Sequence, residues 1–227
     1  MPYPDRMSGN GRPLNPNTPR RNTTMAGNNS AEIRVAGTGK LYVADAGTAA
    51  PATFGTDPAV DWSGAGWKDL GFTSGDGVTF SKKDKLEAID SWQSVSPVHY
   101  IYSARDLSLK FSMLQFNEDT LPFFMGGGSV KAEPTPAVDT YRYEIAERPF
   151  ADVRALGLEF TDVKAGGTTA VTYRFIIPRG QVTASDDIKL ARKAASQLGV
   201  TFSAMSKGDG KPLATFLMKD SQYSATV

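Results

Sequence analysis

The acidic side chains that could do chemistry form two closely spaced pairs. Glu87 with Asp90, and Asp186 with Asp187, have the residue types of a glycosidase site, which needs one carboxyl group as acid and a second as nucleophile or base. Acids this close in sequence are more commonly only solvated, and no Ser nucleophile motif, P-loop or dinucleotide fingerprint accompanies them. We therefore predict that the protein is not an enzyme and has no catalytic residues.

The chain is poorly equipped to bind a metal or a cofactor. Its 227 residues include one histidine, His99, and no cysteine, which excludes zinc fingers, iron–sulfur clusters, disulfides and thiol nucleophiles. Asp57, Asp61 and Asp69 lack the spacing of a calcium-binding loop. His99 lies in an aromatic segment that predicts a strand, so we expect a half-buried structural histidine. No metal and no cofactor is expected.

Three consecutive glycines, Gly126 to Gly128, could be read as a phosphate cradle or as the end of a helix. They follow a predicted helix of about nine residues that begins with Asn117 as N-cap, so the helix dipole has the wrong direction for a phosphate. We therefore interpret the glycines as a C-cap. A helix this short is not stable alone and is expected to pack on a sheet.

Most other segments predict short antiparallel strands. In residues 107–114 the apolar side chains alternate with polar ones, which indicates a half-buried strand. Residues 164–168 and 207–211 each predict a hairpin loop between the flanking strands. Strands are expected at 39–44, 78–89, 98–103, 107–114, 140–147, 152–163, 170–177, 180–184, 198–206 and 212–218, and at 187–191, where a helical turn would also fit. The predicted fold is mainly β, an antiparallel sandwich or barrel with one short flanking helix.

The N-terminal segment differs in composition from the rest. Residues 1–24 hold four arginines, among them Arg12, Arg20 and Arg21, against Asp5; the net charge is +3 here and −2 over the remainder. With five prolines and almost nothing apolar, the segment cannot fold by itself. Either it is an expression remnant or upstream start before Met25, or it is an arm that docks on a neighbouring subunit, which we favour. We expect a basic arm at 1–24 and one β-rich domain at 25–227.

No segment predicts a signal peptide or a membrane anchor. The near-balanced charge, +1 overall, also argues against a general nucleic-acid-binding protein.

Residues 45–66 form an unusually long loop without hydrophobic period, and loops of this length are commonly functional. Phe54 and Trp62 lie in it. They either make a contact with another protein or fold back onto their own sheet, and the residues alone do not decide between these alternatives.

The predicted strand at 78–89 is strongly polar in its middle. Its charged residues mean that it is solvated on most sides or lines an aqueous surface. They are Lys82, Lys83, Asp84, Lys85 and Glu87.

The order of these pieces resembles the major tail protein, or tail tube protein, of long-tailed bacteriophages, and most closely those that infect actinobacteria. The strand Gly39 to Ala44 (GKLYVA) is similar to the family's opening strand. The segment Trp67 to Val78 (WKDLGFTSGDGV) is similar to a motif that follows, and a polar strand then ends at Trp92. Residues 116–121 and the C-terminal strand–loop–strand also look like theirs.

The resemblance implies hexameric rings that stack into a tube around a tape-measure protein, between tail terminator and distal tail proteins. Each subunit would add strands to an inner barrel through which DNA passes without specific binding; the tube belongs to the virion and is assembled in the host cytoplasm. The 45–66 loop, with Phe54, Asp57, Asp61 and Trp62, is then the expected inter-ring stacking element, and the polar strand the candidate inner-barrel strand. Its lysines are expected to pair with acids of the adjacent subunit or to face outward, because a cationic lumen would hold DNA.

Other classes stay open. A β-sandwich with exposed aromatic residues could be a monomeric or trimeric adhesion or carbohydrate-binding module, or a capsid decoration protein. The tube of a contractile injection machine is a further alternative within the same resemblance.

Overall fold

The part of the chain that the structure describes is mainly β. The computed structural model describes residues 28, 32–51, 54, 62–134, 138–148, 150–163, 170–208 and 210–220. The chain divides into two units, Met1–Ile33 and Arg34–Val227, and the fold below is that of the second unit. Its elements are β1 (Thr38–Asp45), β2 (Lys68–Asp69), β3 (Thr79–Ser91), β4 (Ser94–Met113), α2 (Thr120–Met125), β5 (Lys131–Ala132), β6 (Tyr141–Arg142), β7 (Arg154–Val163), β8 (Ala170–Ser185), β9 (Leu198–Ala204) and β10 (Thr215–Lys219).

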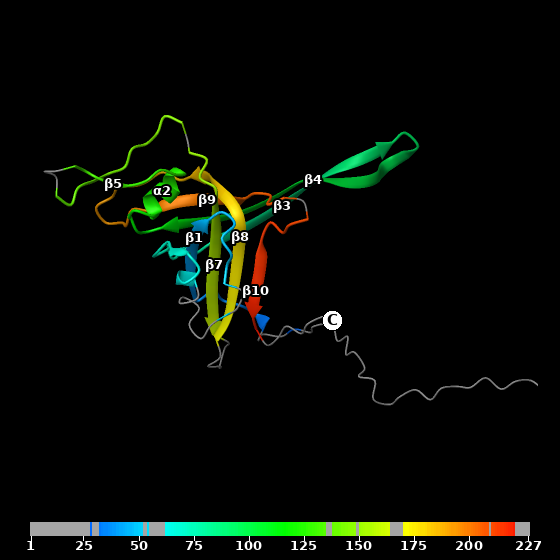
Figure 1. Cartoon of the computed structure of the whole chain (residues 1–227). Coiled ribbons are helices and arrows are strands. Elements are labelled where there is room, and N and C mark those ends of the chain that lie inside the picture. The colour runs from blue at the N-terminus through cyan, green and yellow to red at the C-terminus, as the bar shows by residue number, and fades with distance from the viewer. Residues whose placement is uncertain are drawn as a thin grey trace, which may run out of the picture. The chain divides into compact units, whose positions relative to one another are not determined.

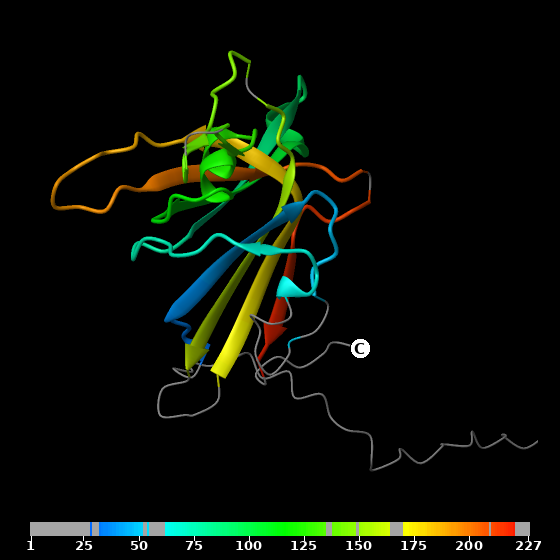
Figure 2. The same ribbon diagram turned by 60° about the vertical axis from the view of Figure 1, so that its left-hand side comes forward.

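One eight-stranded antiparallel sheet organises the unit. Its strand order is β2–β1–β7–β8–β9–β4–β3, with β10 also paired to β8; β5 and β6 form a separate small sheet. The first half of β8 lies between β7 and β10, and its last residues pair with β9. β8 is curved, and a register shift between Val182 and Ala184 lies in its second half. Because of this curvature, β9, β4 and β3 cross over the layer formed by β1, β7 and β10 (Figures 1 and 2). The predicted mainly β class with one short helix is confirmed.

The central strands are buried on both faces. On β1, Leu41 and Val43 belong to the main core, whereas Tyr42 and Ala44 belong to a second cluster on the opposite face. Side chains of a strand alternate between faces, so both faces of β1 are covered. The second cluster is built on Trp62 and Trp67, which come from the segment before β2.

Helix α2 packs on the sheet as expected, but it is shorter than predicted. It spans six residues and begins three residues after Asn117, whose side-chain oxygen accepts hydrogen bonds from the backbone N–H groups of Asp119 and Thr120 at 2.9 and 2.8 Å. Asn117 therefore makes a turn that precedes the helix. Gly126 ends it in the left-handed conformation at φ 78°, so the C-cap interpretation is confirmed. Phe123 stacks between Phe111 of β4 and Phe202 of β9.

Several strand boundaries differ from the predicted ones. Residues 98–103 and 107–114 belong to one 20-residue strand, β4, and 170–177 and 180–184 belong to one strand, β8. The burial pattern of 107–113 agrees with the predicted alternation. The short strands β5 and β6 replace a predicted loop and a longer predicted strand.

Two predictions of pairing are wrong. Residues 187–191 form no strand; Ala191 makes one isolated bridge with Ala194, around a turn at residues 192–193. The loop 207–211 does not close a hairpin, because β9 and β10 do not pair with each other but with different halves of β8. By contrast, the predicted pairing of the strands on either side of 164–168 is confirmed by the antiparallel register of β7 and β8.

Candidate assembly surfaces

The most exposed element of the described chain is the hairpin of β3 and β4. Only residues 108–113 of β4 pair with β9; from Leu107 toward the tip, β4 pairs with β3 alone. The hairpin therefore leaves the sheet and projects from it (Figure 1). A register shift between Lys85 and Leu86 marks the start of its distal part, residues 86–103. We call this distal part the hairpin arm.

The hairpin arm is rich in exposed apolar side chains. Trp92, at its tip, is 100% exposed. Single exposed apolar residues are ordinary, but a continuous group of them marks an interaction surface. In a monomer these side chains are hydrated, at a cost in free energy. The exposed apolar residues on the arm are Leu86, Ile89, Trp92, Val95, Val98, Tyr100, Ile101 and Tyr102.

Besides the two-residue strand β2, two longer strands are edges of the sheet in the described part of the chain. β3 ends the strand order and pairs with β4 only, and β10 pairs with β8 only. Backbone N–H and C=O groups on such edges are a template for another strand. The edges are close to each other at one place, because Phe80 of β3 and Phe216 of β10 have ring centroids 6.1 Å apart.

The aromatic residues of the 45–66 loop surround a buried arginine. Trp62 is fully buried, and its ring stacks on Tyr42 at 4.5 Å. Its indole N–H donates to Glu159 at 2.9 Å. The Arg174 guanidinium lies between the rings of Trp62 and Phe54, 4.7 Å from each centroid, and donates to the backbone carbonyl of Pro51 at 2.9 Å.

Of the two alternatives for these aromatic residues, the structure has the one in which Trp62 folds back onto its own sheet. Trp62 is therefore an anchor of the loop and not an exposed contact residue. Asp57 and Asp61 lie outside the described residues. That the loop stacks rings stays a prediction.

One acid of each candidate catalytic pair contacts a lysine. Glu87 pairs with Lys85 at 3.1 Å, and Asp186 accepts a hydrogen bond from Lys110 at 3.0 Å. No cluster of three or more metal-ligating side chains exists among the described residues. His99 is exposed on the hairpin arm, opposite Ile89, so the prediction of a half-buried histidine is wrong: the arm has no second layer to bury it.

A comparison with known protein families shows to which family the chain belongs. A family model described as phage tail tube protein matches residues 25–227. The chain belongs to the phage tail tube proteins. A comparison with curated proteins finds no match. The protein is thus a structural, non-enzymatic component of the phage tail in the virion, and its family implies a homo-oligomeric tube.

Four charged residues of the tail tube protein's polar strand, Lys82, Asp84, Lys85 and Glu87, form ion pairs within the chain. Asp84 lies opposite Arg105 in the β3–β4 register and accepts from its Nε at 2.7 Å; Lys82 reaches the same carboxylate at 2.7 Å. The hydrogen bond from Arg105, and then that from Lys82, hold the pKa of Asp84 below its ordinary value, and the same contact raises the pKa of Arg105. This cluster lies where the hairpin leaves the core.

These pairs change the expectation for the lysines. We expected most of them to pair with an adjacent subunit or to face outward, but Lys82 pairs with Asp84 and Lys85 with Glu87 of the same chain. Lys83 lies opposite Asp106 in the register. Strand neighbours two residues apart share a face, which makes the pairs local. Lys82 and Lys85 thus have acidic partners within the chain.

Other features fall outside the described residues or were not foreseen. Arg12, Arg20 and Arg21 lie outside them, as they also lie before the matched segment of the family, which starts at Met25. The structure describes no helix long and apolar enough to cross a membrane. The sequence analysis did not predict that the hairpin arm is exposed. Its apolar residues show no alternation of the kind seen in residues 107–113, and this could have indicated it.

Proposed function

We propose that this tail tube protein forms hexameric rings that stack into a tube around a tape-measure protein, and that the tube conducts genomic DNA. The exposed hairpin arm carries the proposal, because its apolar side chains need a cover that the described chain does not provide. The free edges of β3 and β10 support it further, since neighbouring subunits in a ring would pair them.

Electron microscopy of the purified chain tests the assembly. We expect rings and tubes in negative stain, with sixfold symmetry in end views. A variant in which residues 86–103 are replaced by a short turn should remain a folded monomer, because the arm makes no contact with β9 and carries exposed side chains. Tubes formed by this shortened variant, or a wild-type protein that remains monomeric, would contradict the proposal.

We assign the lumen to the face of the tube that carries β3, with Lys82, Lys83, Asp84, Lys85 and Glu87. The balanced charge on this strand supports the assignment, because each unpaired cation in the lumen would strengthen DNA binding by counterion release. The variant Asp84→Asn with Glu87→Gln removes two acids per subunit and should make tubes retain DNA at low salt. Asp186→Asn with Asp187→Asn is the matched control. Equal DNA retention by both variants would contradict the assignment of β3 to the lumen.

The stacking of rings is assigned to the 45–66 loop, together with the arm at 1–24. Asp57→Lys with Asp61→Lys changes the charge of the loop and leaves the Trp62 anchor in place, so rings should form but stack poorly. Removal of residues 1–24, with Arg12, Arg20 and Arg21, should weaken or redirect stacking. Tubes of unchanged length from both variants would refute these roles.

The partners and the host rest on the sequence resemblance. We propose that the tube ends meet tail terminator and distal tail proteins, and that the phage infects actinobacteria, on the motif from Trp67 to Val78. Assembly would take place in the host cytoplasm.

A further inference from the structure

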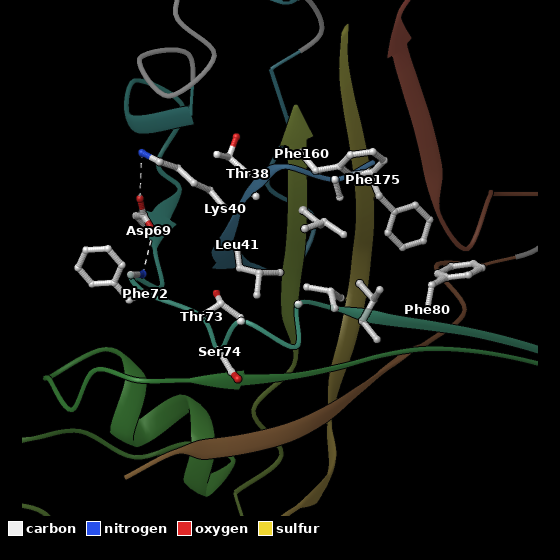
Figure 3. A pocket seen from close by; sticks show the side chains of 18 of the residues that line it. Thr38, Lys40, Leu41, Asp69, Phe72, Thr73, Ser74, Phe80, Phe160 and Phe175 are labelled. Atoms are coloured by element: carbon white, nitrogen blue, oxygen red, sulfur yellow. Dashed lines mark hydrogen bonds and ion pairs between the residues drawn. The ribbon is translucent and has the colours of Figure 1, made fainter. Parts of the chain in front are cut away.

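An apolar cavity lies beside the main core. It measures about 830 Å³, in the range of pockets that hold ligands, and lies where β1, β7 and β8 face the segment between β2 and β3. Leu41, Phe160 and Phe175 come from the strands of one wall, and Phe80 of β3 lies against Phe175, with ring centroids 5.1 Å apart (Figure 3). Three of the lining aromatic residues, Phe72, Phe80 and Phe216, are exposed, and an occupant of the cavity would cover this apolar surface.

The chemistry of the lining indicates an uncharged occupant. Among the lining residues only Lys40 and Asp69 carry charge, and they pair with each other at 3.7 Å (Figure 3). A phosphate or a nucleic acid finds no available cation there, and a charged peptide would lose its hydration without a partner. The cavity therefore suits an apolar segment of protein.

The tip of the hairpin arm has the matching composition. Residues 91–98 (SWQSVSPV) contain no charged side chain. Trp92 and Val95 stand fully exposed at this tip. An aromatic side chain buries about 150–250 Å² when it is covered, more than most other residues can offer.

The hairpin arm of one chain cannot fill its own cavity. Residues 86–103 pair only with each other, and β4 joins the sheet beside β9. The tip is thus carried away from β1 and β7, which form the cavity wall (Figure 1). Only another copy can bring the tip to the cavity.

We propose that Trp92 and Val95 of one copy dock into this cavity on the next copy in the tube. The proposal rests on self-assembly as a tail tube protein. A protrusion and a cavity at different places on one chain make a heterologous contact, which repeats until it closes a ring or continues as a filament. Every copy then contributes one tip and one cavity, and the exposed arm and the open core are covered by the same contact.

Cross-linking between two single-cysteine variants tests the docking, because the natural chain has no cysteine. Ser96→Cys places a thiol at the exposed tip. Gly75→Cys places one on the cavity lining, where an added Cβ meets no atom within 4 Å.

The two proteins are mixed, assembled into tubes and treated with a short bis-maleimide. We expect a peptide that joins positions 96 and 75, identified by mass spectrometry. Ser96→Cys mixed with Leu190→Cys, an exposed position outside the cavity, is the control and should give none.

The outcomes separate this inference from the proposed function. Tubes without the 96–75 cross-link, or with equal cross-linking in the control, would overturn the docking and leave the tube assignment intact; a wild-type chain that never assembles would overturn both. As a second measurement, Trp92→Ala should keep the circular dichroism of the monomer, since this side chain is fully exposed, but should raise the protein concentration needed for tubes at least tenfold. Leu190→Ala should leave that concentration unchanged; equal effects of the two variants would contradict the docking.

Discussion

The Arg174 guanidinium and the Glu159 carboxylate are neighbours on β8 and β7 and bond at 2.8 and 2.9 Å, with both side chains buried. The pair lies in the second cluster, opposite the main core. Because Glu159 also accepts from Trp62, and Arg174 also donates to Pro51, the pair joins the sheet to both ends of the 45–66 loop.

Replacing Arg174 by alanine should destabilise the monomer strongly. The substitution leaves the Glu159 carboxylate buried without its partner and removes the cation between two aromatic rings, so we expect a loss of about 3–5 kcal/mol in the free energy of unfolding. Urea unfolding measures it. The control is Lys110→Ala, whose exposed pair with Asp186 is expected to contribute at most about 1 kcal/mol. Equal losses for both variants would contradict the anchoring role.

Tryptophan fluorescence should report assembly through one residue. Of the three tryptophans, Trp62 and Trp67 are 0% and 4% exposed in the monomer, whereas Trp92 is 100% exposed. The monomer emission therefore contains a solvated component, which should shift to shorter wavelength when tubes form and Trp92 enters the next copy. Trp92→Phe should remove this shift and still assemble, since an aromatic ring is retained. A shift of equal size in Trp92→Phe would show that the signal has another source.

Buried residues could be predicted from the sequence on strands that have one face against the core and the other in solvent. The alternation in Leu107, Leu109, Phe111 and Met113 reports contacts with a single layer, and the structure buries these four. Arg174 and Glu159 were not recognisable as buried, because alternation assigns them to the other face, and the residues that cover this face come from a distant loop. The alternation of residues along a strand does not show whether a segment distant in sequence will pack on its polar face.

Strand ends and pairings were less predictable for a related reason. The pattern of β4 changes beyond Leu107 because the hairpin arm leaves the core, so a single strand gives two different signals. The partner of β10 is β8 and not its neighbour in sequence, β9, and no local motif distinguishes these outcomes. The tip at 91–98 could be noticed in the sequence by its lack of charged residues. The proposed cavity could not, because its lining residues come from β1, β2, β3, β4, β7, β8 and β10 and the segment between β2 and β3.

Glycine at position 157 should be required by the Trp62 anchor. A Cβ added there would collide with the Trp62 ring and approach Cζ3 of Trp67 to 3.3 Å. Gly157→Ala is therefore expected to lower the free energy of unfolding by about 1–3 kcal/mol through overpacking. Near-ultraviolet circular dichroism should also change, because both rings shift. Gly64→Ala is the matched control, since its added Cβ meets no atom within 4 Å. An unchanged spectrum in Gly157→Ala would contradict the tight packing of this cluster.

The charge cluster at the base of the hairpin should make its stability depend on pH. Arg105, and then Lys82, lower the pKa of Asp84, so the native state holds the ionised carboxylate more strongly than the unfolded state does. The sign follows from this direction: the stabilisation is fully present above the ordinary aspartate value of 3.8 and is lost as the pH falls through the lowered native value. The variant Asp84→Asn lacks this electrostatic stabilisation at every pH. Amide exchange of residues 80–85 and 104–109 should thus be faster in Asp84→Asn than in wild type at pH 6–7, and the difference should shrink as the pH falls below 3.8 and through the lowered native value. The pair is accessible to solvent, so the difference should also shrink as salt is added.

The control for this prediction is Asp90→Asn, on the same strand near the tip, which should leave these amides unchanged. A difference that persists undiminished in acid would mean that Asp84 acts through packing instead of charge.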